Sequence, residues 1–384
     1  MRKTLAALTG CVFVVLLASR GAVAQAPPAA GPADAGTALR SREALSEQDK
    51  AALRQWMDAR VRALAEASRR LDEATRTQDE AARSAAAKAL QAARKQLVEP
   101  LGQGPTPAFR TGYAEIAMAA FPPYMGMGND PRGSDPRVAL YLTQTLASLK
   151  QTASLDLMLA ALSSRHPAVR YWAARAIRDM RGEIKGNLVD RTIAELARAG
   201  AKEGYPPAVQ MIYEAVDFRT QVAGSAPRVI AAWLEILNGR IQFYDTDLVT
   251  EFYPDAAVLG QLAASPDLTD ADKKRASQIA LAILDRCVQR WADVARPDEG
   301  SPIEPVNPYN PYSVREWHLR YQLTSVTEQA EALLRKLNPV SGSGAPDVAK
   351  AMRDLATAEQ VRAAFDKWQM VVQPAAQATQ PAPS

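Results

Sequence analysis

Cysteine and histidine are scarce in this chain of 384 residues, which has two of each: Cys11, Cys287, His166 and His318. The chain has no Cys-x-x-Cys pair and no pair of histidines spaced for a helical zinc site. It also lacks a Gly-x-Ser-x-Gly elbow, a phosphate-binding glycine loop followed by Lys-Ser or Lys-Thr, and a dinucleotide-binding glycine pattern. These absences argue against zinc enzymes, serine hydrolases, nucleotide hydrolases and nicotinamide-dependent dehydrogenases. We therefore predict no metal site and no cofactor.

Aromatic residues make up only 6% of the chain, whereas alanine is abundant in every segment after residue 50. Sheets favour aromatic and β-branched residues. Alanine loses no side-chain entropy in a helix and lets helices pack closely. With 47% hydrophobic and 23% charged residues, the chain otherwise has the composition of a globular protein. The composition therefore predicts an all-α fold.

The N-terminal region lacks a hydrophobic run of the roughly 20 residues that a membrane-spanning helix needs. Its apolar run, Leu5–Ala18, follows Arg2 and Lys3 and precedes the small-residue motif Ala22-Val23-Ala24. This order is typical of a secretory signal peptide. We predict a signal peptide over residues 1–24, cleavage after Ala24, export to the periplasm or the extracellular space, and no transmembrane segment after cleavage.

Two alternatives exist for this segment. The first is a retained membrane anchor, which the shortness of the apolar run disfavours. The second is a lipoprotein, because Leu8-Thr9-Gly10-Cys11 resembles a lipoprotein cleavage box. Most of the apolar run follows Cys11, however, so cleavage there would leave little hydrophobic sequence for the export machinery.

Cleavage after Ala24 would remove Arg2, Lys3 and Arg20 and leave 43 basic and 42 acidic side chains. Nucleic-acid binding requires a concentrated basic surface, so this balance predicts no nucleic-acid partner. Cys287 would be the one remaining cysteine, which excludes an intramolecular disulfide. Its neighbours Ile283, Leu284 and Val288 predict that the thiol is a buried packing group.

Glycine and proline are absent between residues 46 and 99, which consist mainly of strong helix formers. Capping signals occur at Ser46 and again at Thr77. We predict a helical hairpin that turns near Thr75–Gln78, with a single long helix as the alternative. Its apolar residues recur at a spacing of three to four, as in a coiled coil: Leu53, Met57, Leu64, Ala67, Leu71 and Ala74. Residues 46–99 are therefore a candidate for homo-oligomerisation, and packing within the chain is the competing interpretation.

Stretches rich in proline and glycine divide the rest of the chain, because they interrupt helices. The two ends of the mature chain combine proline and alanine without an apolar period, which predicts disorder. The last helical part is predicted to be a helix pair, roughly Val314–Leu337 and Asp347–Val371. The predicted order is a disordered linker at 25–45, the hairpin at 46–99, a connection at 100–136, a helical array at 137–295, a proline-rich linker at 296–313, C-terminal helices at 314–372 and a disordered tail at 373–384.

One stretch of the array carries a repeat pattern. A leucine-rich helix ends at Leu162, and after a short polar loop the next helix opens with Pro167-Ala168-Val169-Arg170 and continues with Ala173, Ala174 and Ile177. Proline suits the first turn of a helix, and alanine lets two helices approach closely. The pattern resembles a HEAT repeat, and Pro207-Ala208-Val209 repeats it at about the period of this class.

The resemblance covers about residues 154–218. It implies an α-α superhelix that acts as a scaffold, and it transfers no catalytic residues. The second copy departs from the pattern, since Gln210 replaces the arginine and Tyr213 a small residue. We therefore expect a short, irregular superhelix.

Acidic residues lie between aromatic residues in the stretch that follows residue 242. Tyr244, Asp245, Asp247 and Glu251 form a candidate loop for binding a hard cation or a sugar. The glycine and the final glutamate of an EF-hand are missing at the required positions. The competing interpretation is that Asp245 or Asp247 caps the next helix.

Our leading hypothesis is an exported, non-enzymatic helical-repeat scaffold that binds a protein or peptide in the periplasm or cell envelope. Arg170, Tyr171 and Arg175 are its candidate partner-binding residues, because aromatic residues and arginine often anchor interfaces. The alternative for Tyr171 is packing between helix layers. The second functional hypothesis is an all-helical periplasmic enzyme that binds or cleaves glycans through carboxylates.

Overall fold

The computed structural model describes residues 35–102, 104–126, 135–245, 252–294, 311–340 and 345–372, apart from the side chains of Val294 and residues 311–316. Every regular element in these ranges is an α-helix or a short 3-10 helix, so the predicted all-α fold is confirmed. None of the helices in the described ranges combines the length and the apolar character needed to cross a bilayer. The predicted signal peptide at 1–24 and the predicted tail at 373–384 lie outside the described residues.

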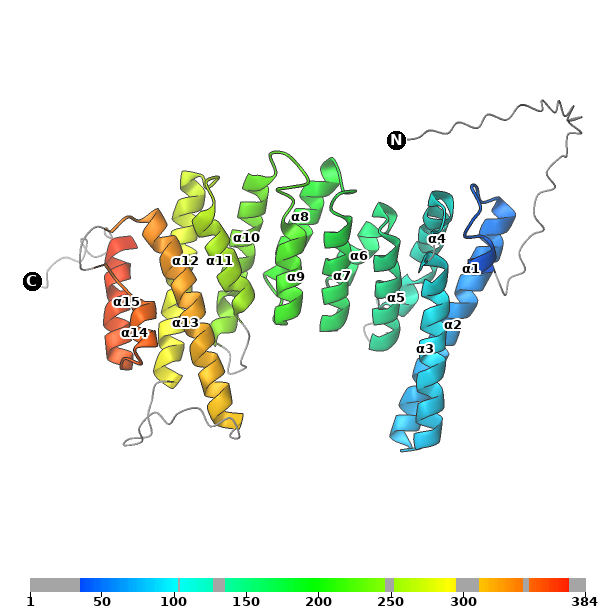
Figure 1. Cartoon of the computed structure of the whole chain (residues 1–384), viewed down its shortest axis with the longest axis horizontal. Helices are drawn as coiled ribbons and strands as arrows, with labels where there is room; N and C mark the ends of the chain where they lie inside the picture. Colours follow the sequence, from blue (N-terminus) through cyan, green and yellow to red (C-terminus); the bar gives the residue numbers. More distant parts are fainter. Residues whose placement is uncertain are drawn as a thin grey trace, which may run out of the picture.

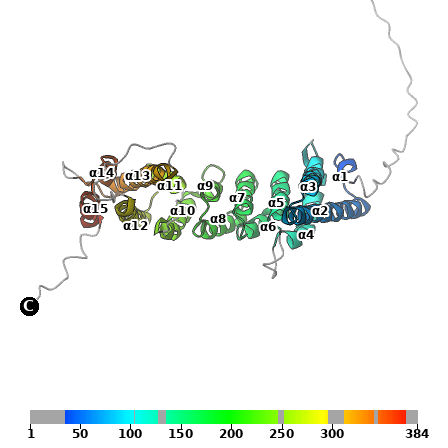
Figure 2. The ribbon, with the colours of Figure 1, turned by 90° about the horizontal axis from the view of Figure 1, so that it is seen from below.

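Two layers of stacked helices form the body of the molecule (Figures 1 and 2). Successive helices of a layer contact one another, and helix pairs also pack across the layers. The first layer contains α5 (Pro136–Leu149), α7 (Pro167–Met180), α9 (Pro206–Val216), α11 (Tyr253–Ala264) and α13 (Pro311–Leu337). The second contains α6 (Leu155–Ala161), α8 (Asn187–Gly200), α10 (Ala226–Arg240) and α12 (Asp270–Val294). The short 3-10 helices are η1 (Pro122–Tyr124), η2 (Thr152–Ser154) and η3 (Ile241–Asp245).

Proline occupies the first or second position of four first-layer helices, α5, α7, α9 and α11. A proline there loses no intrahelical hydrogen bond, because the first amides of a helix have no carbonyl partner. Each of the four helices then places a valine in the core: Val138, Val169, Val209 and Val258. The Pro-Ala-Val pattern seen at two positions in the sequence is therefore part of a feature shared along the layer.

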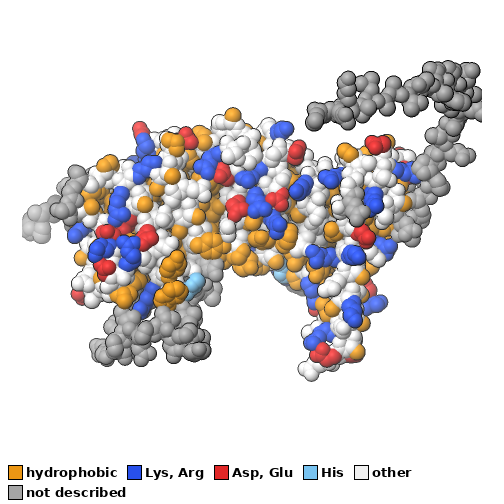
Figure 3. Space-filling model, in the orientation of Figure 1, with side chains coloured by type: hydrophobic (Ala, Val, Ile, Leu, Met, Phe, Trp, Pro, Cys, Tyr) orange, Lys and Arg blue, Asp and Glu red, His pale blue; other side chains and the backbone are white. Residues whose placement is uncertain are grey.

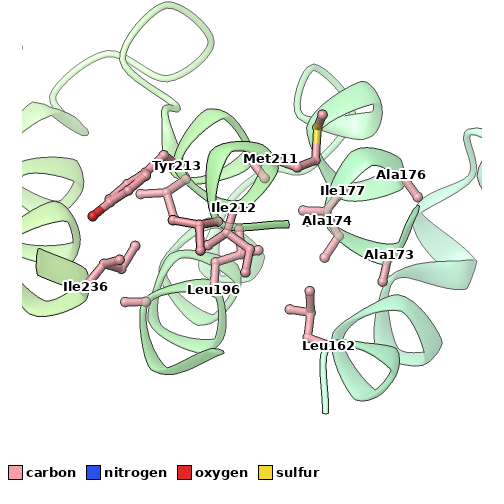
Figure 4. Packing of buried hydrophobic residues seen from close by; sticks show 14 of the residues in the cluster. Leu162, Ala173, Ala174, Ala176, Ile177, Leu196, Met211, Ile212, Tyr213 and Ile236 are labelled. Atoms are coloured by element: carbon pink, nitrogen blue, oxygen red, sulfur yellow. The ribbon is translucent and has the colours of Figure 1, made fainter. Parts of the chain in front are cut away.

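Aliphatic side chains fill a seam between the two layers. Figure 4 shows Ile212 of α9 and Leu196 of α8 turned toward each other, with Ile177 of α7 close by, and all three are buried. Three alanines on α7, at 173, 174 and 176, are also fully buried and have little side chain to hold the helices apart. Small residues at these positions therefore set the close spacing of the helices.

Gly239 of α10 lies against Ala201, the residue after α8. A β-carbon at Gly239 would be 2.5 Å from the Ala201 Cβ and 2.8 Å from its carbonyl oxygen. We expect Gly239→Ala to lower the free energy of unfolding by about 1–3 kcal/mol through overpacking, despite the higher helix propensity of alanine. Urea denaturation followed by circular dichroism measures this change. Gly102→Ala at the end of α3, where an added β-carbon would meet no atom of another part of the chain within 4 Å, is the control and should be neutral or stabilising by up to about 1 kcal/mol. Equal costs for both substitutions would contradict the close contact.

Two long helices, α2 (Glu47–Arg76) and α3 (Glu80–Gly102), pack along each other at the N-terminal end of the array. The chain reverses between them, and Gln78 has a positive φ of 57°. Ser46 and Asp49 form the capping box that begins α2. Leu53, Met57 and Leu64 are buried within this one chain, so the apolar stripe of α2 is covered without a second copy. The helix α4 (Pro107–Ala120) packs on α2 and connects the hairpin to the array.

Residues 35–45 were expected to belong to a disordered linker, but they pack on the hairpin. The short helix α1 (Ala35–Ala38) contacts α2 and α3, and Leu39 is fully buried. Gly36 lies against the ring of Trp56, where a side chain would collide with the indole. The hydroxyl of Thr106 donates to the carbonyl of Arg42 at 2.6 Å. Contacts with distant parts of the chain order this segment, which has no helical periodicity of its own.

The C-terminal part contains α14 (Val348–Arg353) and α15 (Ala358–Val372), where one continuous helix over 347–371 was expected. Leu355 has a positive φ of 53° and is exposed, and the amide of Ala356 donates to the carbonyl of Ala351, which closes α14. Thr357 and Gln360 then form the capping box that begins α15. The break separates two short helices: α14 packs on α13, and α15 packs on α12.

The buried carboxylate of Glu331 on α13 holds these two helices. It accepts hydrogen bonds from the amides of Val348 at 2.8 Å and Ala349 at 3.0 Å, and from the indole of Trp368 at 2.7 Å. Burial raises the pKa of Glu331, although the three donors and Arg335 oppose the shift. One side chain therefore caps α14 and anchors α15.

Cys287 on α12 is fully buried and unpaired, as its aliphatic neighbours predicted. Burial raises the pKa of its thiol to about 12. The thiol is therefore neutral at physiological pH and acts as a packing group.

Candidate functional site

The three partner-binding residues predicted on α7 differ in their surroundings. The guanidinium of Arg170 binds the buried carboxylate of Glu203 through Nε and Nη2, the latter at 2.6 Å, and its Nη1 donates to the carbonyl of Ser164 at 2.8 Å. Nε and Nη2 thus join α7 to the segment before α9, and Nη1 binds the loop before α7. Tyr171 is half-buried against the core. Arg175 lies 4.5 Å above the ring of Trp172. Arg170 holds helices together, and the partner-binding role of the three residues stays a prediction.

The predicted acidic and aromatic loop lies partly outside the described residues, which omit Asp247 and Glu251. Tyr244 is buried and stacks on Phe252 with ring centroids 4.2 Å apart. The carboxylate of Asp245 pairs with Arg286 at 3.2 Å near the surface. The described members of this set therefore do not converge on a common space.

Asp255 belongs to a fully buried polar cluster instead. Its carboxylate accepts from Arg240 Nε at 2.8 Å and from the hydroxyls of Tyr213 at 2.9 Å and Tyr244 at 3.2 Å. Burial alone lowers the pKa of Arg240, but the ion pair with Asp255 raises it overall. Burial is also the main cause of the raised pKa of both tyrosines. The carboxylate is saturated by donors, so the cluster holds α9, α10 and α11 together.

Four aromatic side chains are strongly exposed at one edge of the first layer: Tyr205, Tyr253, Trp317 and Tyr321. Between 41% and 62% of each residue's surface is accessible. Tyr205 precedes α9, and Tyr253 is the first residue of α11. Trp317 and Tyr321 lie near the start of α13. These three helices begin at the same edge of the molecule (Figure 1). The rings of Trp317 and Tyr321 stack with centroids 5.9 Å apart. Figure 3 shows hydrophobic side chains gathered along this side of the molecule. We call the four residues the aromatic edge.

A pocket of about 360 Å³ opens next to the aromatic edge, between the end of α7 and helices α9, α10 and α11. Its volume lies in the range of small-ligand sites. Tyr253 contributes to both the pocket and the aromatic edge, and its hydroxyl donates to Gln210 at 2.8 Å. The pocket is also lined by Arg181, Tyr213, Glu214, Asp217, Trp233, Ala257, Val258 and Gln261. We call this space the Arg181 pocket.

The two carboxylates that line the Arg181 pocket are already paired. Glu214 accepts from Arg178 Nη1 at 2.7 Å and from the side-chain amide nitrogen of Gln210 at 3.0 Å. Asp217 accepts from Arg219 Nε and Nη2, each at 2.8 Å. Arg178 also binds the carboxylate of Asp179 through Nε and Nη2, so it is shared between two carboxylates.

Arg181 has a different set of contacts. Its Nε donates to the carbonyl of Arg178, and its Nη1 donates to the carbonyls of Glu214 and Asp217. Within the described ranges it forms no ion pair with a carboxylate, and its Nη2 has no hydrogen-bond acceptor. Burial lowers its pKa, but arginine stays charged at any physiological pH. Arg181 is nevertheless attracted by the nearby carboxylates of Asp217, Glu214 and Asp179.

The aromatic edge and the Arg181 pocket were not predicted as a site. One sequence signal was available, because Tyr205-Pro206 and Tyr253-Pro254 are the same dipeptide at the starts of two helices in one layer. The pocket had no such signal, since its residues come from four helices.

Among the described residues, no group of three or more histidine, cysteine, aspartate or glutamate side chains is arranged to hold a metal ion. In comparisons with protein-family models, curated proteins and solved structures, the chain has no match.

Proposed function

We propose that this protein is an exported, non-enzymatic scaffold of the HEAT-like kind that binds a protein or peptide partner in the periplasm or cell envelope. The stacked helix pairs support this proposal together with the repeat motif of residues 154–218 and the signal-peptide pattern of residues 1–24. The observation that carries it is the aromatic edge. Tyrosine and tryptophan give large contact areas with few rotatable bonds, and they are enriched in binding surfaces.

The position of the aromatic edge favours an elongated partner. Its residues come from three successive helices of one layer, so a bound segment would cross the starts of α9, α11 and α13. The apolar stripe of α2, the candidate surface for homo-oligomerisation, is buried in its own chain. We therefore place the principal binding surface on the aromatic edge and assign the hairpin a structural role.

Site-specific cross-linking tests this proposal in the native envelope. A photoreactive amino acid replaces Tyr321 in one tagged chain and the exposed Arg69 of the hairpin in another. A defined protein cross-linked from position 321 and not from 69 is the expected result. Cross-links from position 321 to polysaccharide, or none at all, would overturn the scaffold proposal.

The double substitution Trp317→Ala and Tyr321→Ala is expected to reduce partner capture at least tenfold, because aromatic anchors commonly contribute 2 kcal/mol or more. Both side chains are exposed, so the melting temperature should change little. Quantitative mass spectrometry of the captured partner measures the loss. Met370→Ala, which removes a side chain of 58% exposure on α15, is the matched control and should leave capture unchanged.

A further inference from the structure

A chain of two hydrogen bonds joins the helices α11 and α13 beneath the aromatic edge. The buried side chain of Gln322 on α13 accepts from the backbone amide of Phe252 at 2.7 Å. Its nitrogen Nε2 lies 2.6 Å from Nε2 of His318, one turn earlier on the same helix. Phe252 directly precedes α11, and its carbonyl accepts from the amides of Asp255 and Ala256, each at 3.1 Å. The two bonds therefore hold the first turn of α11 on α13.

The donors in this chain fix the protonation of His318. A backbone amide can only donate, so the side-chain oxygen of Gln322 faces Phe252 and its NH2 group faces the imidazole. An NH2 group also can only donate, so Nε2 of His318 is the acceptor. A histidine nitrogen accepts a hydrogen bond only when it carries no proton. The arrangement therefore requires a neutral imidazole with its proton on Nδ1.

The imidazole of His318 has no other hydrogen bond or ion pair with a described residue. The helices α11, α12 and α14 pack on α13. Charged side chains of these helices are engaged with other groups: Asp255 with Arg240, Asp285 with Arg362, Arg286 with Asp245, Arg290 with Asp293, Lys350 with Asp354 and Arg353 with Glu328. On α13 itself, Arg320 also has a partner. A second proton on His318 would therefore not be held by an ion pair with any described carboxylate.

A second proton on His318 would break the chain. Nε2 would become a donor that faces the NH2 group of Gln322, which is also a donor. Gln322 could accept from the protonated ring only by turning its amide over, and the amide of Phe252 would then lose its acceptor. We propose that His318 is an acid-sensitive switch, whose protonation releases the first turn of α11 from α13 and loosens the aromatic edge.

The switch lies among the residues of the aromatic edge. Tyr253 follows Phe252 at the start of α11, and Trp317 and Tyr321 precede His318 and Gln322 on α13. Loss of the link would leave these three exposed rings less firmly placed relative to one another, so the protonated form should bind a partner more weakly. This consequence rests on the proposed scaffold function, whereas the switch itself does not.

Hydrogen exchange at the amide of Phe252 tests the switch on the folded protein. Phenylalanine and histidine are labelled with nitrogen-15, and exchange is followed by NMR and corrected for the intrinsic pH dependence of amide exchange. Protection of this amide is expected to fall about tenfold between about pH 8 and pH 5, the range in which histidine gains its proton. The histidine spectrum at neutral pH should show Nε2 of His318 without a proton. Unchanged protection, or a proton on Nε2 at neutral pH, would overturn the switch.

Substitutions separate the switch from general effects of acid. His318→Gln offers an acceptor oxygen and cannot gain a proton, so the amide of Phe252 should stay protected at both pH values. His166→Gln removes the other histidine and should keep the pH dependence of the parent chain. If His318→Gln does not fold, Gln322→Glu serves instead, because a carboxylate accepts from both the amide and the protonated ring. A pH dependence that survives these changes at 318 and 322 would contradict the proposal.

Cross-linking from position 321 measures the consequence for binding. The yield of the parent chain is expected to fall about tenfold between about pH 8 and pH 5, and that of His318→Gln should not. An equal fall in both chains would show that His318 does not control binding. Because the exchange measurement needs no partner, it decides the switch even if no protein is cross-linked at neutral pH and the scaffold proposal fails.

Discussion

Replacing Asp255 with alanine is expected to lower the free energy of unfolding by about 3–5 kcal/mol, the usual cost of removing one partner of a buried ion pair. The substitution leaves the guanidinium of Arg240 without a counter-charge in the interior and leaves the hydroxyls of Tyr213 and Tyr244 without their acceptor. Urea denaturation followed by circular dichroism and by tryptophan fluorescence measures the loss. Because the cluster joins α9, α10 and α11, both signals should shift together.

Asp245→Ala is the matched control for this prediction. Asp245 lies ten residues earlier and also pairs with an arginine, Arg286, but both side chains are partly exposed. Such surface pairs contribute about 0–1 kcal/mol. The double variant Asp255→Leu with Arg240→Met should be less damaging than Asp255→Ala, since it removes both charges. Equal stability of Asp255→Ala and Asp245→Ala would show that the buried cluster does not hold the helices.

Glu331→Ala is expected to cost about 3 kcal/mol or more, because it leaves three donors without an acceptor at roughly 1–3 kcal/mol each. The donors are the amides of Val348 and Ala349 and the indole of Trp368. Since these donors belong to α14 and α15, the two helices should open before the rest of the array. Hydrogen exchange followed by mass spectrometry should show faster exchange over 348–372 than in α8 or α10.

Glu328→Ala provides the comparison for Glu331→Ala on the same helix. Glu328 pairs with Arg353 of α14, and both side chains are partly exposed. Its removal should change the free energy of unfolding by less than about 1 kcal/mol and should leave exchange over α14 and α15 nearly unchanged. If both variants accelerate exchange equally, Glu331 is not the anchor of the C-terminal helices.

Local sequence signals account for most of the helices that were predicted correctly. These signals lie in or next to the helix that they predict. Examples are Pro167 at the start of α7, Ser46 before α2, and the stretch without glycine or proline at 46–99. The break between α14 and α15 also had a local signal, the capping box of Thr357 and Gln360. The apolar residues on both sides of the break continue a helical period, and this period predicted one helix over 347–371.

The candidate site was harder to predict because it depends on how helices are arranged in space. Arg240 and Asp255 are on different helices, and no spacing rule identifies them as partners. Tyr205 and Trp317 lie along one edge only because α9, α11 and α13 begin on the same side of the array. Leu39 was assigned to a linker for the same reason, since the residues that bury it are remote in sequence.

The buried polar contacts form a continuous connection across the centre of the array. Arg170 binds the side chain of Glu203, Arg240 donates to the carbonyl of Glu203, and Arg240 pairs with Asp255. This connection runs from α7 through α10 to α11. Under a pulling force applied at the two ends, we expect the hairpin and the C-terminal helices to detach first. The central helix pairs, which carry the Arg181 pocket, would then keep their shape while the protein is under tension.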